Sequence, residues 1–277
     1  MSLSTRQFDV LRDLIFKELG LQFEDAKVEF LDRRAEKRML ALGMEKTDDY
    51  LFHLRFLDQQ GAEMQQLANL ITTNETYMFR EFDQLQAFAD HCLPEVLERK
   101  EALGVRRLRI WSAGCSSGEE AYTLAIILRE VMHDVDRWDI QILGTDIDQV
   151  RLEMASGQTY GQYAVRDVPD EYMARHMIPV TAETFRVRPE TARLVEFRHL
   201  NLSDRASIRS IRDMDFIFCR NVLIYFSEAS RKAVVEHFYN SLARGGFLYL
   251  GHCESVSRIS TLFQLKRLDK HLVYWKE

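Results

Sequence analysis

The first hundred residues carry apolar side chains three and four positions apart, which is the spacing of amphipathic helices. In the first segment this spacing follows a candidate N-cap, Ser4 or Thr5, and stops at Gly20. The pattern predicts four helices in all, at residues 4–19, 25–42, 47–57 and 62–71. Because no convincing strand pattern interrupts them, we expect an all-helical domain over residues 1–72.

After Gly104 the pattern changes to short, apolar, β-rich runs that alternate with helical stretches. Such alternation is typical of a doubly wound α/β sheet with parallel strands buried on both faces. The runs that predict strands lie at residues 108–113, 139–146, 194–202, 215–222, 247–252, 263–268 and 271–276. We expect the last two to pair as an antiparallel hairpin through Asp269 and Lys270. The sheet is expected to be Rossmann-like and to occupy residues 105–277.

Two stretches depart from this alternation. Residues 160–198 are richer in Tyr, Arg and Pro, and they predict a small inserted antiparallel β-subdomain. Within it we expect a short helix at residues 170–177 and two strands at residues 184–188 and 193–197. Residues 73–104 connect the helices to the sheet, and the polar cluster at their start is equally consistent with a ligand-binding segment and with the N-cap of a long helix.

The composition is that of a globular protein, because 46% of the 277 residues are hydrophobic and 29% are charged. The net charge of −6 provides no overall field that attracts nucleic acid or an anionic membrane, so an acidic partner needs a local basic patch. No run approaches the ~18 apolar residues of a membrane span, and the N-terminus lacks a signal-peptide pattern. The four cysteines are scattered, so we expect reduced thiols, no metal site and a cytoplasmic protein.

The ends of the predicted strands carry the candidate chemistry, because open α/β sheets bind ligands beyond the carboxyl ends of their strands. The first strand leads into a Gly/Ser loop, residues 114–118, whose backbone amides can approach a ligand closely. The second strand ends at Asp146, where an acid can accept both hydroxyls of a ribose, whereas Asp148 is better explained as a helix N-cap. Although the loop is not a GxGxxG motif, the two features together predict an adenosine-type site.

Polar residues also follow two later strands. Asn201 lies at the end of the strand predicted at residues 194–202. Arg220 and Asn221 lie at the end of the next one, and Tyr225 comes shortly after it. Amides at strand ends can bind an adenine edge or the amine and carboxylate of a ligand, and both asparagines are also typical of turns.

These motifs, taken in order, resemble those of the CheR family, the S-adenosylmethionine-dependent protein-glutamate O-methyltransferases of bacterial chemotaxis receptors. Together with the helical region before them, they extend the resemblance over essentially the whole chain. The matching segments are TTNETYMFRE, RIWSAGCSSGEEAYTLAI, GTDID, FRHLNL, FCRNVLIYF and GGFLYLGHCES.

The resemblance implies a set of residues that contact the cofactor. In it, Asp146 binds the ribose, Asn201 and Leu202 surround the adenine, and Arg80 and Tyr225 lie nearest the transferred methyl. Glu120 is favoured as a ligand over its neighbour Glu119. The full cofactor set is Asn74, Thr76, Arg80, Gly114, Glu120, Asp146, Asn201, Leu202, Arg220 and Asn221.

The chemistry implied by the resemblance needs little from acid–base groups. A glutamate with a pKa near 4.3 is already ionised at neutral pH, so it can attack the methyl of the sulfonium without a general base. The products are a glutamate methyl ester and S-adenosylhomocysteine. The protein contributes alignment and the removal of water, and we expect Arg80 and Tyr225 to provide the alignment.

A basic cluster on the second predicted helix is the candidate docking surface for the substrate. Residue spacing alone is also consistent with a solvated face balanced by neighbouring acids. The resemblance implies that this helix meets the acidic, cytoplasmic methylation region of the receptors. We expect no nucleic-acid partner, no membrane insertion and a monomeric enzyme. The cluster consists of Lys27, Arg33, Arg34, Lys37 and Arg38.

The inserted subdomain bears on a second contact with the receptor. Some family members grip a C-terminal receptor pentapeptide there by adding a strand, and they carry a long, glycine-bearing turn. The corresponding stretch here, MIPVTAETFRVRPETARL, is short and lacks glycine. We therefore expect an enzyme that does not depend on the pentapeptide.

Three other classes of protein were weighed against this interpretation. A Rossmann-type oxidoreductase lacks support because the loop does not have the dinucleotide spacing and no catalytic Lys or His stands beside it. A nucleic-acid amino-methyltransferase would need a Pro-Pro-aromatic turn, whereas NVLIY has no proline. A cofactor-binding adaptor that docks on receptors without turnover is disfavoured by the presence of Arg80 and Tyr225.

Overall fold

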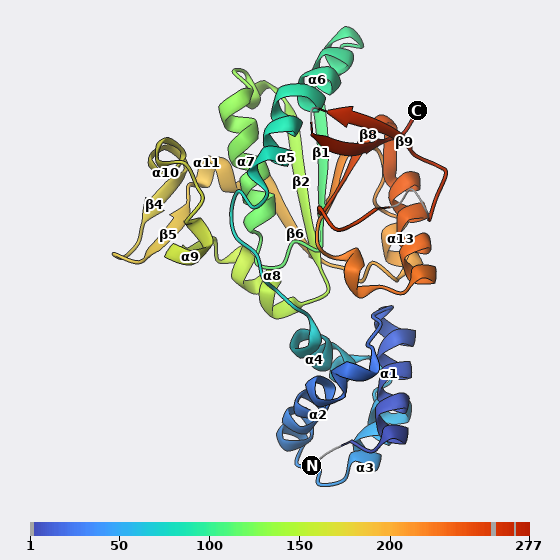
Figure 1. Ribbon diagram of the computed structural model, residues 1–277. Helices are drawn as coiled ribbons and strands as arrows, with labels where there is room; N and C mark the ends of the chain where they lie inside the picture. The colour runs from blue at the N-terminus through green and yellow to red at the C-terminus, as the bar shows by residue number, and fades with distance from the viewer. Residues whose placement is uncertain (1–2, 256–258, 269) are drawn as a thin grey trace.

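The computed structural model describes residues 3–255, 259–268 and 270–277. Figure 1 shows a helical N-terminal part beneath a larger part that is built on a twisted sheet. A small three-stranded sheet projects from one side of the larger part. No helix among the described residues is both long and apolar enough to cross a membrane.

The N-terminal part consists of helices, as the apolar spacing predicts. Ser4 is the N-cap of the first helix, and it forms a capping box with Gln7. Gly20 ends that helix in the left-handed conformation, at φ 74°. The elements are α1 (Thr5–Leu19), η1 (Asp25–Lys27), α2 (Val28–Leu42), α3 (Thr47–Phe52), the π-helical turn η2 (His53–Leu57) and α4 (Ala62–Ile71).

The connecting segment is extended at first and helical afterwards. Residues 72–81 contain no helix, and Phe79 and Glu81 adopt positive φ angles of 61° and 58°. The alternative of one long helix from an N-cap in this cluster is therefore wrong. The helices that follow are α5 (Phe82–Ala87), η3 (Phe88–Cys92) and α6 (Leu93–Ala102).

The main sheet has seven strands in the order β6-β2-β1-β7-β8-β10-β9. Its first five strands are parallel, and β10 and β9 run antiparallel at one edge. Asp269, predicted in the turn of this hairpin, lies outside the described residues. The strands are β1 (Arg107–Ala113), β2 (Asp139–Asp146), β6 (Val195–His199), β7 (Met214–Cys219), β8 (Leu242–Leu250), β9 (Gln264–Leu268) and β10 (His271–Trp275).

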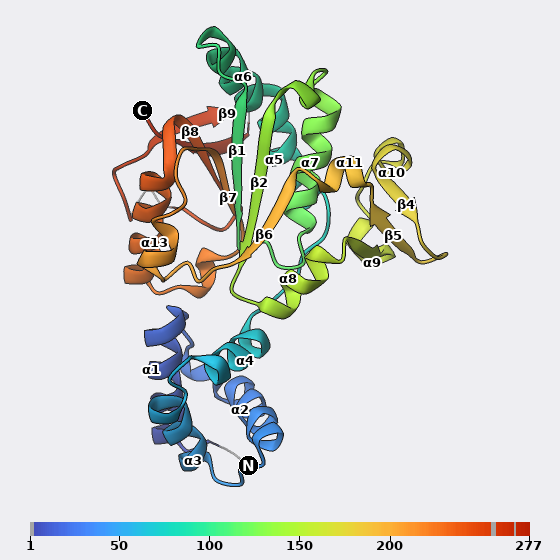
Figure 2. The ribbon, with the colours of Figure 1, turned by 180° about the vertical axis from the view of Figure 1, so that it is seen from behind.

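Helices cover both faces of this sheet, so the predicted doubly wound fold is confirmed (Figures 1 and 2). Because side chains alternate across a strand, Ile110 and Phe216 pack toward α7 while Trp111 and Ile217 pack toward α13. The layer with Trp111 is continuous with the core of the N-terminal helices. The helices that connect the strands are α7 (Glu119–Val131), η4 (Val135–Arg137), α8 (Gln149–Ser156), α12 (Arg205–Ile208), η5 (Leu223–Tyr225) and α13 (Glu228–Ser241).

The inserted subdomain is confirmed as a small antiparallel sheet, with one correction. The predicted strand at residues 193–197 belongs to β6, which pairs in parallel with β2 of the main sheet. Its alternating pattern is that of a half-covered edge strand, which sequence alone does not distinguish from a subdomain strand. The subdomain comprises β3 (Thr159–Gly161), α9 (Gln162–Val165), α10 (Asp170–His176), β4 (Met177–Pro179), β5 (Thr184–Val187) and α11 (Pro189–Ala192), with strand order β3-β5-β4.

The end of α1 is fastened to loops at the carboxyl edge of the main sheet. Asn201 donates a side-chain hydrogen bond to the Glu18 carbonyl (2.9 Å), and the Ser203 hydroxyl donates to the Leu19 carbonyl (3.2 Å). These bonds satisfy carbonyls that a helix end leaves free. The Gln22 amide donates to the Tyr225 carbonyl (2.9 Å), so the chain beyond α1 lies directly over the sheet edge.

Candidate active site

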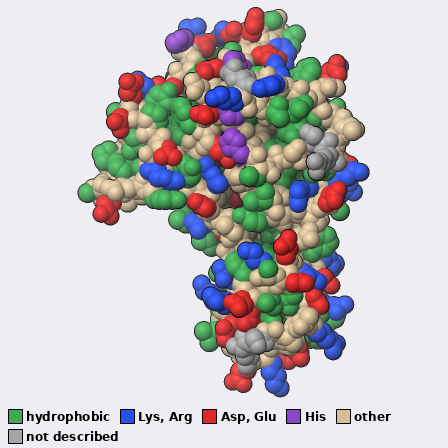
Figure 3. Space-filling model, viewed as in Figure 1, with side chains coloured by type: hydrophobic (Ala, Val, Ile, Leu, Met, Phe, Trp, Pro, Cys, Tyr) green, Lys and Arg blue, Asp and Glu red, His purple; other side chains and the backbone are tan. Residues whose placement is uncertain are grey.

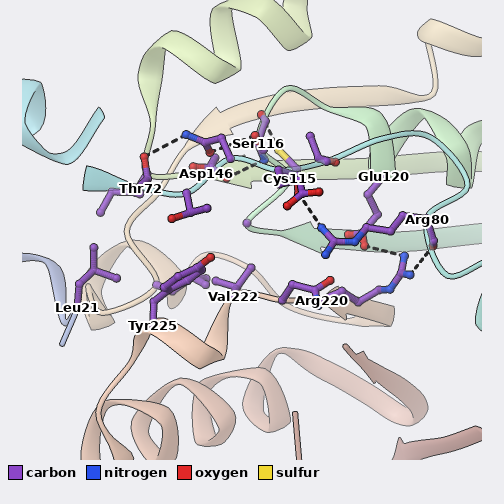
Figure 4. A pocket seen from close by; sticks show the side chains of 18 of the residues that line it. Leu21, Thr72, Arg80, Cys115, Ser116, Glu120, Asp146, Arg220, Val222 and Tyr225 are labelled. Atoms are coloured by element: carbon purple, nitrogen blue, oxygen red, sulfur yellow. Dashed lines mark hydrogen bonds and ion pairs between the residues drawn. The ribbon is translucent and has the colours of Figure 1, made fainter. Parts of the chain in front are cut away.

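A pocket opens at the carboxyl edge of the sheet, between the sheet and the end of α1 (Figure 4). It encloses about 1120 Å³, counted out to the solvent at its mouth. All of the predicted cofactor and catalytic residues line it: Asn74, Thr76, Arg80, Gly114, Glu120, Asp146, Asn201, Leu202, Arg220, Asn221 and Tyr225. The structure thus brings together residues that are up to about 150 positions apart in the chain, as expected for a site at strand ends.

The glycine loop forms one wall of the pocket. Gly114 has φ 81°, and a β-carbon added there would lie 2.4 Å from Cγ2 of Val222, so only glycine fits. The amides of Gly114 and Cys115 both donate to the Thr145 carbonyl, at 2.7 and 2.9 Å. The loop is therefore held against the end of β2, where Asp146 begins the next loop.

Asp146 is buried at the end of β2, and both of its carboxylate oxygens accept backbone amides. One carboxylate oxygen accepts the Ser116 amide (2.7 Å), and the other accepts the Asp148 amide (2.8 Å). Each oxygen retains a lone pair for a hydroxyl. Burial raises the pKa of Asp146, and the neighbouring amides oppose that shift. Asp148 caps α8 by accepting from the Arg151 amide, as predicted.

Arg220 joins three segments of the site. Its side chain is 4% exposed and forms ion pairs with Glu81 (3.1 Å) and Glu120 (3.3 Å). It also donates to the Arg80 carbonyl in the connecting segment. Its Nε, although buried, has no hydrogen-bond partner in the described part of the chain. Arg220 thus fixes the connecting segment and α7 relative to the end of β7.

The two adjacent acids at the start of α7 have different environments. Glu120 lines the pocket and accepts from the Ser112 hydroxyl (2.6 Å) as well as from Arg220. Glu119 is buried and bonded to the Ser117 hydroxyl, and burial raises its pKa. The structure therefore places the predicted ligand, Glu120, in the pocket and its neighbour outside it.

Two asparagines of the predicted set bond mainly to the protein itself. Asn74 donates to the Asp148 carboxylate (2.8 Å) and accepts from the Ser116 hydroxyl (3.1 Å), which ties the connecting segment to the glycine loop. Asn201 accepts the Ser203 amide (2.8 Å) in a turn and donates to α1. Their side chains shape the pocket, and for Asn201 the turn role is observed directly.

Arg80 and Tyr225 reach the pocket from opposite walls (Figure 4). The Arg80 guanidinium donates to the Glu75 carbonyl (2.6 Å) and lies 5.8 Å from the centre of the Tyr77 ring. Among the described residues, neither Arg80 nor the Tyr225 hydroxyl has an acidic partner. Both side chains therefore remain able to bind a ligand.

Residues outside the predicted set complete the site. Leu21 and Phe23, which follow α1, line the pocket. Glu254 is not in the pocket but accepts the amides of Asn221 and Gly251, both at 2.8 Å, and so holds the loop that carries Tyr225. No local motif marks Leu21 or Phe23, whereas Glu254 falls in the GHCES segment and was a detectable signal.

Three of the five predicted docking residues, Lys27, Arg33 and Lys37, are exposed on or beside α2. Arg34 is half-buried on the same helix, and its Nε donates to the Leu70 carbonyl of α4 (3.4 Å). The Arg34 guanidinium stacks 3.8 Å from the centre of the Phe30 ring. Figure 3 shows basic and acidic side chains interspersed on this helical part, so the surface carries both signs of charge.

Arg38 has a different environment from the other four. Its side chain is 17% exposed, and it bonds both carboxylate oxygens of Glu63, at 2.9 and 2.6 Å. The hydrogen bond to the Glu63 carboxylate raises the pKa of Arg38, and the Tyr50 hydroxyl donates to the same carboxylate (3.0 Å). Arg38 therefore links α2 to α4, and a substitution there would disturb the domain as well as any docking surface.

A parallel sheet with a glycine loop after β1, an acid at the end of β2 and a pocket at their carboxyl edge defines an α/β protein that binds a nucleoside-containing cofactor. Two family models match the chain: the CheR methyltransferase all-alpha domain over residues 6–72, and the CheR methyltransferase SAM-binding domain over residues 74–272. The chain belongs to the CheR methyltransferase family. It is a methyltransferase, and its cofactor is S-adenosylmethionine.

Several relatives align over nearly the whole chain. Chemotaxis protein methyltransferase 2 of Vibrio cholerae is 36% identical over 96% of this chain and 91% of its own length. Chemotaxis protein methyltransferase 1 of Pseudomonas aeruginosa is 30% identical over 99% of both chains. The Escherichia coli chemotaxis protein methyltransferase is 30% identical over 96% of this chain and 90% of its own length.

The residues that line the pocket are chemically compatible with S-adenosylmethionine. The remaining lone pairs on the two Asp146 carboxylate oxygens would allow it to accept two ribose hydroxyls. Glu120 and Arg220, which form an ion pair with each other in the pocket wall, would face the polar end of the cofactor. Among the described residues, no cluster of three or more His, Cys, Asp or Glu side chains is arranged so that it could hold a metal ion.

Proposed function

We propose that this enzyme methylates glutamate side chains of chemotaxis receptors in the cytoplasm, acting as a monomer. The proposal is supported by the names of its relatives and by one feature of the pocket. The described residues that line the pocket include Arg80 and Tyr225 but no histidine or lysine. A pocket lined by neither histidine nor lysine suits a nucleophile that is already ionised, and a glutamate carboxylate is such a nucleophile at neutral pH.

The bound cofactor supplies an electrophilic methyl group. In the overall reaction a carbon–sulfur bond breaks and a carbon–oxygen bond forms, so the positive sulfonium and the negative carboxylate both become neutral. The protein therefore needs to orient the carboxylate and exclude water. Arg80 is positioned to orient the carboxylate by a charge-assisted hydrogen bond, and the Tyr225 hydroxyl is positioned to direct it from the opposite wall.

Steady-state kinetics on two variants test these roles. For Arg80→Ala we expect kcat to fall by about 100-fold, and for Tyr225→Phe by about tenfold, because each loses one oriented hydrogen bond. The affinity for S-adenosylhomocysteine is measured alongside, so that loss of cofactor binding is separated from loss of alignment. Unchanged turnover in both variants would contradict the assignment.

The basic surface of α2 gives a second expected result. Methylation of receptors should decline steeply as salt is added, because the attraction between a basic helix and an acidic receptor is screened. The charge reversals Arg34→Glu and Lys37→Glu should raise KM for the receptor several-fold. Arg38 is left intact because of its bond to Glu63, and Lys232→Glu on α13 is the control. If all three charge reversals changed KM for the receptor equally, the proposal that α2 is the docking surface would be wrong.

The subdomain gives a third expected result. The turn between β4 and β5 covers only residues 180–183 and contains no glycine. We propose that methylation is independent of a receptor's C-terminal pentapeptide. Calorimetry with such a peptide should give no measurable heat of binding at micromolar concentration, and saturable micromolar binding would overturn this part of the proposal.

A further inference from the structure

An arginine of the inserted subdomain is stacked on two tyrosine rings beside the pocket. The guanidinium carbon of Arg166 lies 3.5 Å from the centre of the Tyr77 ring and 3.9 Å from the centre of the Tyr163 ring. The guanidinium is thus in contact with both tyrosine rings. Cation–π contacts of this kind restrict the movement of the group and do not use its N–H donors.

This stack joins the subdomain to the wall of the active site. Tyr77 and Arg80 both line the pocket, and the Arg80 guanidinium carbon lies 5.8 Å from the same Tyr77 ring. The Met78 amide donates to the Ala164 carbonyl (2.8 Å), which anchors the connecting segment to α9. The Tyr77 ring is thus flanked by two arginines, one assigned to the reacting glutamate and one on the subdomain.

The donors of Arg166 are only partly used. Its Nη1 donates to the Tyr163 carbonyl (2.6 Å), and no carboxylate within the described residues forms an ion pair with it. The residue is exposed, so its remaining N–H groups face solvent. A planar arginine held in this way loses little side-chain freedom when it binds a carboxylate in a bidentate manner.

We propose that Arg166 binds a second carboxylate of the protein substrate, next to the glutamate that accepts the methyl. This inference rests on the proposed function, because it assigns the reacting glutamate to Arg80. Side chains three or four positions apart on a helix have β-carbons only about 5–6 Å apart, so two acids of one helical substrate match two arginines that flank one ring. Arg166 would then select acidic sequences around the methylated position.

The test is a cycle of paired substitutions in enzyme and receptor. Methylation by the wild-type enzyme and by Arg166→Ala is measured on a receptor and on a variant receptor whose acids flanking the methylated glutamate are changed to glutamine. We expect Arg166→Ala to raise KM for the receptor about tenfold, with kcat and the affinity for S-adenosylhomocysteine unchanged. On the variant receptor, Arg166→Ala should have no further effect.

The controls separate recognition from support of the fold. Arg186→Ala removes an exposed arginine of the same subdomain, on β5, and should leave KM unchanged. An equal KM for Arg166→Ala and wild type, an equal effect on both receptors, or a parallel loss of cofactor affinity would each overturn the proposal. A wild-type enzyme that methylates no receptor would instead overturn the proposed function on which it rests.

Discussion

Replacing Asp146 by alanine is expected to lower the affinity for S-adenosylhomocysteine by about 100-fold or more, because two charge-assisted hydrogen bonds to the ribose are lost. The expectation follows from the free lone pair on each carboxylate oxygen, whose other contacts are the amides of Ser116 and Asp148. Isothermal calorimetry measures the change directly. Asp139→Ala, at the opposite end of the same strand, should bind like wild type.

The same residue gives the affinity a pH dependence with a defined sign. Because burial raises the pKa of Asp146, its carboxylate takes up a proton at a higher pH than an exposed aspartate does. Acidification should therefore weaken cofactor binding before ordinary aspartates titrate. Asp146→Asn should bind weakly at every pH and lose this dependence. If Asp146→Ala bound S-adenosylhomocysteine within about twofold of the wild-type affinity, the prediction that Asp146 binds the ribose would be wrong.

The second large effect is expected on stability. Arg220→Ala should lower the free energy of unfolding by about 3–5 kcal/mol, because it leaves the carboxylates of Glu81 and Glu120 without their buried cation. Cofactor affinity should decline as well, since Arg220 also holds the connecting segment through the Arg80 carbonyl. Chemical denaturation and calorimetry on the same preparation measure both quantities.

A compensated variant distinguishes the unpaired charges from simple loss of packing. Arg220→Met combined with Glu81→Gln and Glu120→Gln should recover most of the stability, because no buried charge remains unpaired. It should not recover cofactor binding. Arg193→Ala, which breaks an exposed pair with Asp136, should cost less than about 1 kcal/mol. If Arg220→Ala were as stable as Arg193→Ala, the ion pairs of Arg220 with Glu81 and Glu120 would not contribute to stability as proposed.

Much of the fold follows from periodicity, because each element has a strong local signal. Ser4 and Gly20 mark the ends of α1 through capping, which depends only on neighbouring residues. The pattern of residues 193–197 predicts a strand but not its sheet, because an edge strand of the main sheet and a subdomain strand each bury one face. The local sequence does not decide that residues 72–81 are non-helical, because this depends on distant contacts such as the bond from Asn74 to Asp148.

The features of the site, too, are predictable from the sequence where they depend on neighbouring residues and not where they depend on distant ones. Asp146 and the glycine loop were predictable because the carboxyl ends of parallel strands meet at one edge. The docking of α1 onto that edge was not, because the Asn201 and Ser203 side chains that cap it are nearly 200 residues away in sequence. Arg38 could not be separated from its basic neighbours, because its partner Glu63 is on another helix. Residue roles in cofactor and substrate binding stay predictions.

The central claim is the transfer of a methyl group to receptor glutamates, and one measurement tests it most directly. Isolated receptor membranes are incubated with the enzyme and with S-adenosylmethionine labelled in the methyl group, and the labelled protein is then treated with mild base. We expect label to enter the receptor and to leave as methanol under base, as a glutamate methyl ester requires, with little transfer by Arg80→Ala. Binding of the enzyme to receptors without incorporation of label, or label that resists base, would contradict the account.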